Sequence, residues 1–102
     1  MHPIIENNKN QIAALCRKHF VKELYAFGSV TRNDFQNDSD IDFLYRFYEN
    51  DIPEKDYADN FFTFKEEIQS TLKRDVDLIA YDFLKNPYFI KIVEKEKEKI
   101  YG

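Results

Sequence analysis

The 102-residue sequence contains one cysteine, two histidines, no tryptophan and no long apolar run. The single Cys16 excludes an internal disulfide, and its helical spacing with Ile12 and Leu15 predicts a buried structural thiol. Two scattered histidines are too few for a zinc site. There is no run long enough to cross a bilayer and no signal-peptide pattern at Met1-His2-Pro3. We therefore expect a cytoplasmic protein that does not bind membranes.

The charge balance is acidic, with 15 lysine and arginine residues against 19 aspartate and glutamate residues and a net charge of −4. Proteins that hold long RNA or DNA usually present a basic face. We therefore expect no polynucleotide binding by this chain alone, and a small molecule or a protein hydroxyl as its substrate. Hydrophobic residues make up 43 % of the chain. This is enough for one modest core, so residues 1–102 are expected to form a single domain.

The spacing of apolar residues predicts an α+β chain in which helices and strands alternate, as they do in α/β proteins. The expected strands are 21–27, 41–47 and 76–81. The expected helices are 5–19, 30–35, 57–72 and 87–100. Asn86-Pro87 is a favourable start for the last helix, because Asn caps well and Pro suits the first helical position.

Two details of the expected helices concern their surfaces. The alternating Glu and Lys residues of 94–99 are expected to form the solvated face of the last helix. Phe62 lies beside the apolar stripe of the 57–72 helix, where it either widens the core-facing side, which we expect, or reaches a partner.

A small-residue turn, Gly28-Ser29, ends the first expected strand, and two aspartates, Asp40 and Asp42, open the second. Because side chains alternate along a strand, the two carboxylates project from the same face. Neighbouring carboxylates repel unless a cation lies between them, and a hard divalent ion is the usual partner. The turn offers backbone N–H groups to an anion such as phosphate. This pattern indicates nucleotide chemistry with a metal ion, and Asp77 supplies a third carboxylate if its strand joins the same sheet.

The segments FGSVTRNDFQNDSDIDFLYRF and DVDLI resemble the nucleotidyltransferase superfamily to which DNA polymerase beta belongs. The short chain is similar to the minimal nucleotidyltransferases, many of which act as antitoxins beside a HEPN-domain partner. The resemblance extends from about Phe20 to the C terminus. It implies a polymerase beta-like fold, with a small mixed sheet flanked by helices.

The resemblance also implies roles for individual residues. The nucleotide-binding residues it implies are Gly28, Ser29 and Arg32. The catalytic residues it implies are Asp40, Asp42 and Asp77, which together would hold two Mg²⁺ ions. Asp77 would in addition help to activate the attacking hydroxyl.

The implied activity is transfer of a nucleoside monophosphate, AMP from ATP, to a hydroxyl on a HEPN toxin, which makes the chain an antitoxin. Larger members of the superfamily carry an extra domain that recognises the acceptor, and 102 residues leave no room for one. We therefore expect a partner protein or a homo-oligomer to complete the acceptor site. Two alternatives remain open: a non-catalytic nucleotide-binding subunit that masks its partner by contact, and a nucleotidyltransferase acting on a small molecule such as an aminoglycoside.

Other interpretations of the acidic cluster fit less well. Asp38, Asp40, Asp42 and Glu49 match the spacing of ligands in a calcium-binding EF-hand loop. Phe43, however, stands where the sharp turn of that loop requires glycine. The Asp-x-Asp motif of sugar-nucleotide transferases belongs to longer chains and leaves the Gly-Ser turn unexplained.

Overall fold

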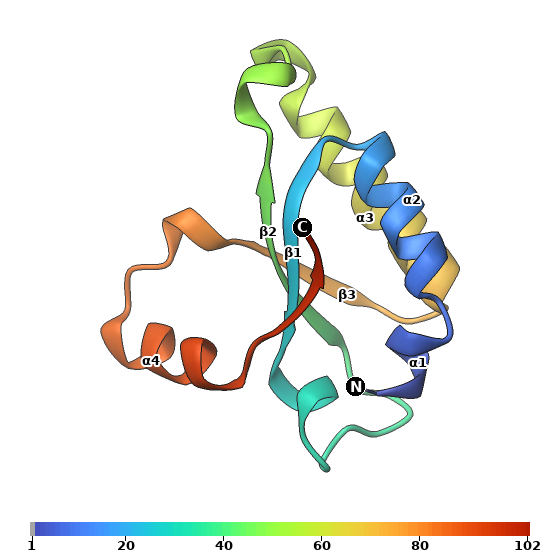
Figure 1. The fold of residues 1–102 in the computed structure, drawn as a ribbon, viewed down its shortest axis with the longest axis vertical. Helices are drawn as coiled ribbons and strands as arrows, with labels where there is room; N and C mark the ends of the chain where they lie inside the picture. The colour runs from blue at the N-terminus through green and yellow to red at the C-terminus, as the bar shows by residue number, and fades with distance from the viewer. Residues whose placement is uncertain (1) are drawn as a thin grey trace.

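The computed structural model describes residues 2–102, which combine one four-stranded sheet with helices on both of its faces (Figure 1). The strands are β1 (Val21–Phe27), β2 (Ile41–Phe47), β3 (Val76–Ala80) and β4 (Glu98–Tyr101). Their order in the sheet is β3-β2-β1-β4. Strand β1 is antiparallel to β2 and β4, whereas β2 and β3 are parallel. The expected α+β architecture with a small mixed sheet is confirmed.

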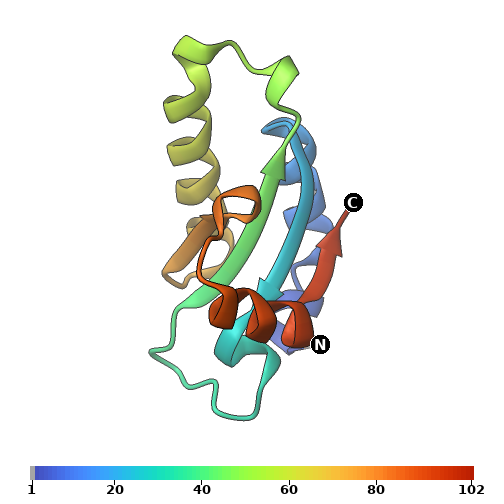
Figure 2. The same cartoon turned by 90° about the vertical axis from the view of Figure 1, so that its left-hand side faces the viewer.

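The α-helices of the described residues are α1 (Pro3–Glu6), α2 (Lys9–Lys18), α3 (Tyr57–Leu72) and α4 (Pro87–Glu96). Helices α2 and α3 cover one face of the sheet, and α4 lies on the opposite face (Figures 1 and 2). Asn86 caps α4 as expected, since its side-chain oxygen accepts hydrogen bonds from the N–H groups of Tyr88 and Phe89. No helix within residues 2–102 combines the length and the apolar character that a membrane crossing requires.

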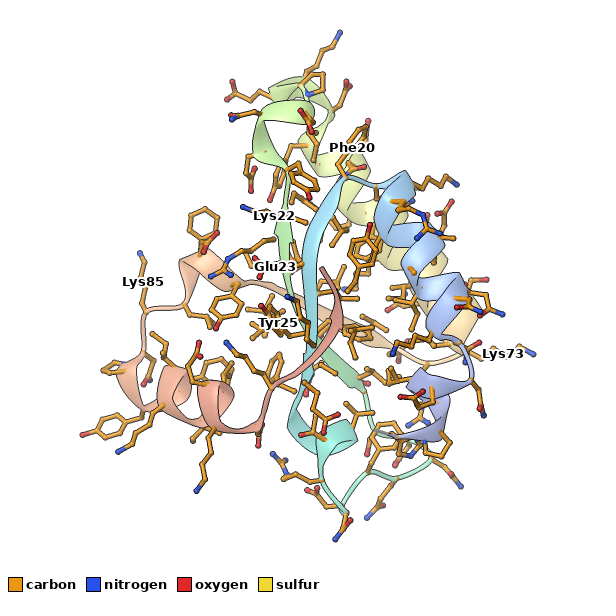
Figure 3. The ribbon with its side chains drawn as sticks, in the orientation of Figure 1. Phe20, Lys22, Glu23, Tyr25, Lys73 and Lys85 are labelled. Carbon is orange, nitrogen blue, oxygen red and sulfur yellow. The ribbon has the colours of Figure 1, made fainter. Side chains whose placement is uncertain are left out.

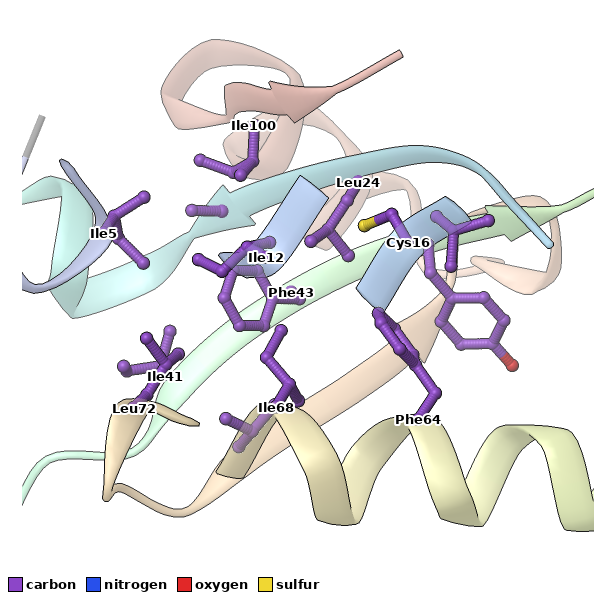
Figure 4. Close-up of a cluster of buried hydrophobic side chains, with 14 of the residues drawn as sticks. Ile5, Ile12, Cys16, Leu24, Ile41, Phe43, Phe64, Ile68, Leu72 and Ile100 are labelled. Carbon is purple, nitrogen blue, oxygen red and sulfur yellow. The ribbon is translucent and has the colours of Figure 1, made fainter. Parts of the chain in front are cut away.

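The alternation of side chains along β2 separates the apolar core from the opposite face of the sheet. Ile41 and Phe43 are fully buried among side chains of α2 and α3, together with Cys16, whose expected burial is confirmed (Figure 4). Burial raises the pKa of the Cys16 thiol to about 12. Asp42, which lies between Ile41 and Phe43 in the sequence, projects from the opposite face of the sheet, toward α4. Leu44 projects from the same face as Asp42 and packs with Val93 of α4.

Three expected helices differ from the observed ones, and the first difference is at the N terminus. The single helix expected at 5–19 is divided into α1 and α2 at Asn7 and Asn8. The side-chain amide of Asn8 donates to the carbonyl of Ile4 at 2.8 Å. Asparagine side chains compete in this way with the helical backbone, which interrupts the helix.

The short helix expected at 30–35 is also wrong. The chain instead forms a single 3₁₀ turn over Gly28–Thr31, and residues 32–40 are irregular. Local side-chain bonds replace helical ones here, since the Ser39 hydroxyl accepts from the N–H of Gln36 at 3.0 Å.

The expectation of a last helix to residue 100 is wrong in a way that affects the candidate site. Helix α4 ends at Glu96, and β4 follows as an edge strand of the sheet. The alternating charges have the two-residue period of a strand, and pairing with β1 buries Ile100.

The third strand ends at Ala80, one residue earlier than expected. Phe62 is 61 % exposed, so its expected place in the core is wrong too.

Candidate active site

Two of the predicted carboxylates stand side by side on the α4 face of the sheet. Asp42 of β2 and Asp77 of β3 are register partners in the parallel ladder. Partners in a parallel ladder project to the same face, so the two side chains meet. Burial, together with the neighbouring charges of Asp77 and Asp40, raises the pKa of Asp42 to about 6. The ionised form of Asp42 is therefore unfavourable, because burial and the neighbouring carboxylates outweigh any positive charge that stabilises it.

Asp40 is less closely placed. It is exposed at the end of the irregular segment 32–40, directly before β2, and acts on Asp42 through its charge. Within residues 2–102, no three His, Cys, Asp or Glu side chains are arranged to hold a metal ion as they stand. The chemistry of the set nonetheless fits a hard cation, because carboxylate oxygens are its preferred ligands and Asp42 bears uncompensated charge.

The Gly28 turn lies directly against this carboxylate pair. Phe27 is the register partner of Asp42, so the turn begins one residue beyond that pairing. Gly28 has a φ of +76°, a left-handed conformation that favours glycine. A Cβ atom at this position would lie 2.5 Å from Oδ2 of Asp42. Only glycine therefore brings the turn and the carboxylate this close together.

The turn is held from the other side by a residue that we did not predict, Glu96 at the end of α4. Its Oε1 accepts from the N–H of Gly28 at 2.9 Å, and its Oε2 accepts from Nη1 of Arg32 at 2.9 Å. A second carboxylate, Asp34, accepts from Nε of Arg32 at 3.1 Å. The sequence analysis missed Glu96 because it assigned residues 94–99 to the solvated face of a helix. The alternation of Glu and Lys in this segment indicated a strand and could have shown that the helix ends near Glu96.

Ser29 is the second residue of the turn and is half-buried. In the part of the chain that the structure describes, its hydroxyl has no hydrogen-bond partner, whereas the Thr31 hydroxyl donates to the carbonyl of Gly28 at 2.7 Å. Thr31 thus closes the turn, and the Ser29 hydroxyl stays free to meet a ligand.

Arg74 stabilises the irregular segment that leads to Asp40. Its Nη2 donates to the carbonyls of Gln36 at 2.6 Å and Ser39 at 2.5 Å, and its guanidinium lies 4.5 Å from the ring centroid of Phe35. Because Arg74 lies two residues before the start of β3, it links the approach to Asp40 with the strand that contains Asp77.

The α4 face beside the carboxylates is polar and aromatic. Tyr25 of β1 points toward α4 and donates to Oε1 of Glu23 at 2.7 Å (Figure 3). Nζ of Lys97 lies 4.9 Å from the Tyr25 ring centroid. Lys97 directly follows Glu96, so these contacts help to hold the end of α4 against the sheet.

Comparison with known proteins gives consistent matches. The family model described as "Polymerase beta, Nucleotidyltransferase" matches residues 10–102. A protein of Methanocaldococcus jannaschii named "Putative protein adenylyltransferase MJ0128" is 38 % identical over 82 residues, which cover 80 % of this chain and 79 % of that protein.

Solved structures agree on the architecture. One described as a minimal nucleotidyltransferase superposes with a TM-score of 0.71 at 25 % identity and covers 96 % of this chain and 95 % of the other. A second contains a tri-AMPylated Shewanella oneidensis HEPN toxin in complex with MNT antitoxin. It superposes with a TM-score of 0.63 at 21 % identity and covers 96 % of this chain and 72 % of the other, a likeness of fold. The expected polymerase beta-like fold is confirmed.

Proposed function

The chain belongs to the polymerase beta family of nucleotidyltransferases, and on this premise we propose that it transfers AMP from ATP to a hydroxyl of a HEPN-domain toxin and so acts as an antitoxin. The observation that carries the proposal is the register pair of Asp42 and Asp77 directly beside the Gly28 turn. Two negative side chains and a small anion-binding turn are the parts that phosphoryl transfer needs in one place.

Asp40, Asp42 and Asp77 are the residues that would hold magnesium. Their oxygen donors and the unfavourable charge on Asp42 support this assignment. Bound Mg²⁺ would neutralise charge on the triphosphate and lower the pKa of the attacking hydroxyl.

The residues of the turn bind and orient the nucleotide. The free hydroxyl of Ser29 donates to a phosphate oxygen, and the guanidinium of Arg32, three residues further along the chain, supplies positive charge. Charge develops on the leaving pyrophosphate during the reaction, so donors placed there stabilise the transition state. Most of the rate enhancement then comes from positioning and electrostatics.

The transfer forms one covalent bond and breaks another. The acceptor hydroxyl oxygen bonds to the α-phosphorus, and the bond from that phosphorus to the oxygen bridging to the β-phosphate breaks, which releases pyrophosphate. The hydroxyl proton passes to Asp77 and from there to solvent. Asp77 suits this role because it is exposed on β3, an edge strand that an acceptor can approach.

Two observations support a protein acceptor. The M. jannaschii relative has a name that describes transfer of AMP to protein, and the AMPylated toxin in a structural neighbour is a HEPN protein. The net charge of −4 also disfavours a polynucleotide.

The direct test is transfer of label from ATP labelled at the α-phosphate, in the presence of Mg²⁺, to the HEPN-domain toxin that we propose as the acceptor. We expect the wild type to label the partner and Asp42→Asn to lose labelling by at least a hundredfold, because charge neutralisation at the site is the main catalytic term. Asp38→Asn removes an exposed carboxylate of the irregular segment before β2 and is expected to label normally. Equal labelling by the wild type and Asp42→Asn would contradict the proposal.

A further inference from the structure

Glu96 is the one carboxylate in the described residues that contacts both the Gly28 turn and Arg32. Its two oxygens are used separately, one for each donor, and its side chain is only 19 % exposed. Glu94 on the same helix is 46 % exposed and instead contacts Tyr81 and Lys97. The contacts of Glu96 are therefore a particular feature of its position and not a general property of the acidic end of α4.

The backbone fixes Glu96 from both sides. Before it, Val93 of α4 is fully buried against Phe27 and Leu44 of the sheet. After it, Glu98 of β4 is paired with Ala26, two residues before Gly28. Since Glu96 lies between these two anchors, it has little freedom to move away from the turn.

These contacts decide which donors of the turn remain for a ligand. The N–H of Gly28 is engaged by Glu96 and its Cα side is packed against Asp42, so the turn is held between two carboxylates. The guanidinium of Arg32 has five N–H donors, of which the bonds to Glu96 and Asp34 use two. The Ser29 hydroxyl and the remaining Arg32 donors stay available.

We propose that Glu96 is a positioning residue for nucleotide binding: it fixes the Gly28 turn and Arg32 so that Ser29 and Arg32 present their free donors to the phosphates. This inference rests on the proposed function, because it assumes that the turn binds a nucleotide. It differs from the expectation that the Gly28 N–H itself binds phosphate. Glu96 remains in place when the nucleotide is bound.

Binding of the ATP analogue AMPCPP with Mg²⁺, measured by titration calorimetry, tests the proposal. Glu96→Ala removes both bonds and is expected to weaken binding about tenfold or more, as loss of a charged hydrogen bond implies. Glu96→Gln keeps an oxygen that can accept from Gly28 but loses the charge, so it is expected to retain part of the affinity, with a loss of about threefold. The matched control Glu94→Gln should bind as the wild type does.

Two outcomes of that titration would overturn the proposal. Unchanged affinity in Glu96→Ala would mean that the contacts do not matter for binding. Tighter binding would mean that the Glu96 carboxylate competes with phosphate for the same donors. If the wild type itself binds no nucleotide, the proposed function fails, and this inference fails with it. Thermal unfolding of each variant identifies any loss of affinity that comes from loss of the fold.

A second measurement follows the Gly28 amide directly. The sequence has only two glycines, Gly28 and Gly102, so selective ¹⁵N-glycine labelling yields a spectrum in which Gly28 is readily assigned. We expect slow exchange of the Gly28 amide with water in the wild type, both free and with AMPCPP bound, and fast exchange in Glu96→Ala. Loss of protection in the wild type on adding AMPCPP would show that Glu96 is displaced, and would overturn the proposal.

Discussion

Asp42 is the residue with the least favourable environment in the candidate site. It is partly buried beside Asp77, and the positive charge of Arg32 acts on it with a smaller effect than burial and the two carboxylates. Arg32 is itself engaged by Asp34 and Glu96. The folded chain therefore retains an unfavourable negative charge where the proposed reaction uses a cation, a common conflict between stability and function.

This conflict predicts a particular pH dependence for the metal-free protein. The pKa of Asp42 rises from its ordinary value of 3.8 to about 6 on folding. Between those values the folded protein binds more protons than the unfolded chain, so the contribution of Asp42 is fully present below pH 3.8 and is lost as the pH rises through 6. With a discount for partial exposure, we expect the loss to be about 1–2 kcal/mol.

Urea unfolding in EDTA at acidic and neutral pH measures this loss. Asp42→Asn cannot ionise, so it should be more stable than the wild type at neutral pH and should lose less stability between the two conditions. The exposed control Asp38→Asn should follow the wild type. The same pH dependence in Asp42→Asn and the wild type would contradict the assigned environment of Asp42.

At the scale of elements, the candidate site depends on how an irregular segment is held. Segment 32–40 has no helix or strand of its own, yet it positions Asp40 at the head of β2. Two carbonyl bonds and a stacked ring connect it to Arg74, and the Ile41 N–H donates to the Asp75 carbonyl at 3.0 Å. The position of Asp40 relative to β3 is thus fixed mainly through Arg74.

Arg74→Ala should loosen Asp40 and leave the Asp42–Asp77 pair in place. In the label-transfer assay, we expect the Mg²⁺ concentration for half-maximal rate to rise about threefold to tenfold, because a loose ligand costs about 1 kcal/mol of binding. Arg74→Lys should show most of this effect, since an ammonium group lacks the planar fork that spans two carbonyls. Lys73→Asn, at a left-handed position that asparagine tolerates, is the control. An unchanged Mg²⁺ requirement in Arg74→Ala would contradict this role.

The elements also show what the sequence could predict. Strands β1 and β2 were predicted with their observed bounds because each is rich in aromatic and branched apolar residues and has a clear end, at Gly28 for β1 and at Asp40 for β2. Strand β4 was missed because its alternating Glu and Lys residues have little β propensity, and pairing with β1 decides its structure. Glu96 was missed for the same reason, since its role depends on a contact across 68 positions of the chain.

At the scale of the whole molecule, the sheet separates the main apolar core from the candidate site. Its α2–α3 face holds the larger apolar core, and its α4 face holds the carboxylates and the turn. Because β3 is an edge strand, Asp77 is exposed at one side of the molecule. Under the proposed function, this arrangement leaves the Asp77 side of the site open, so a second protein can present a hydroxyl to it without any rearrangement of the core.

Because the Asp77 side of the site is open, we predict covalent modification of the partner and not only formation of a complex. When the chain is coexpressed with the HEPN-domain toxin that we propose as its partner, we expect intact-mass spectrometry to show the toxin heavier by one or more AMP groups. Coexpression with Asp42→Asn should leave the partner mass unchanged, although the two proteins still copurify, because the substitution changes one partly buried side chain within the site. If the wild-type chain also leaves the partner unmodified while suppressing its activity, the chain acts by contact alone. The register pair of Asp42 and Asp77 would then serve nucleotide binding without transfer.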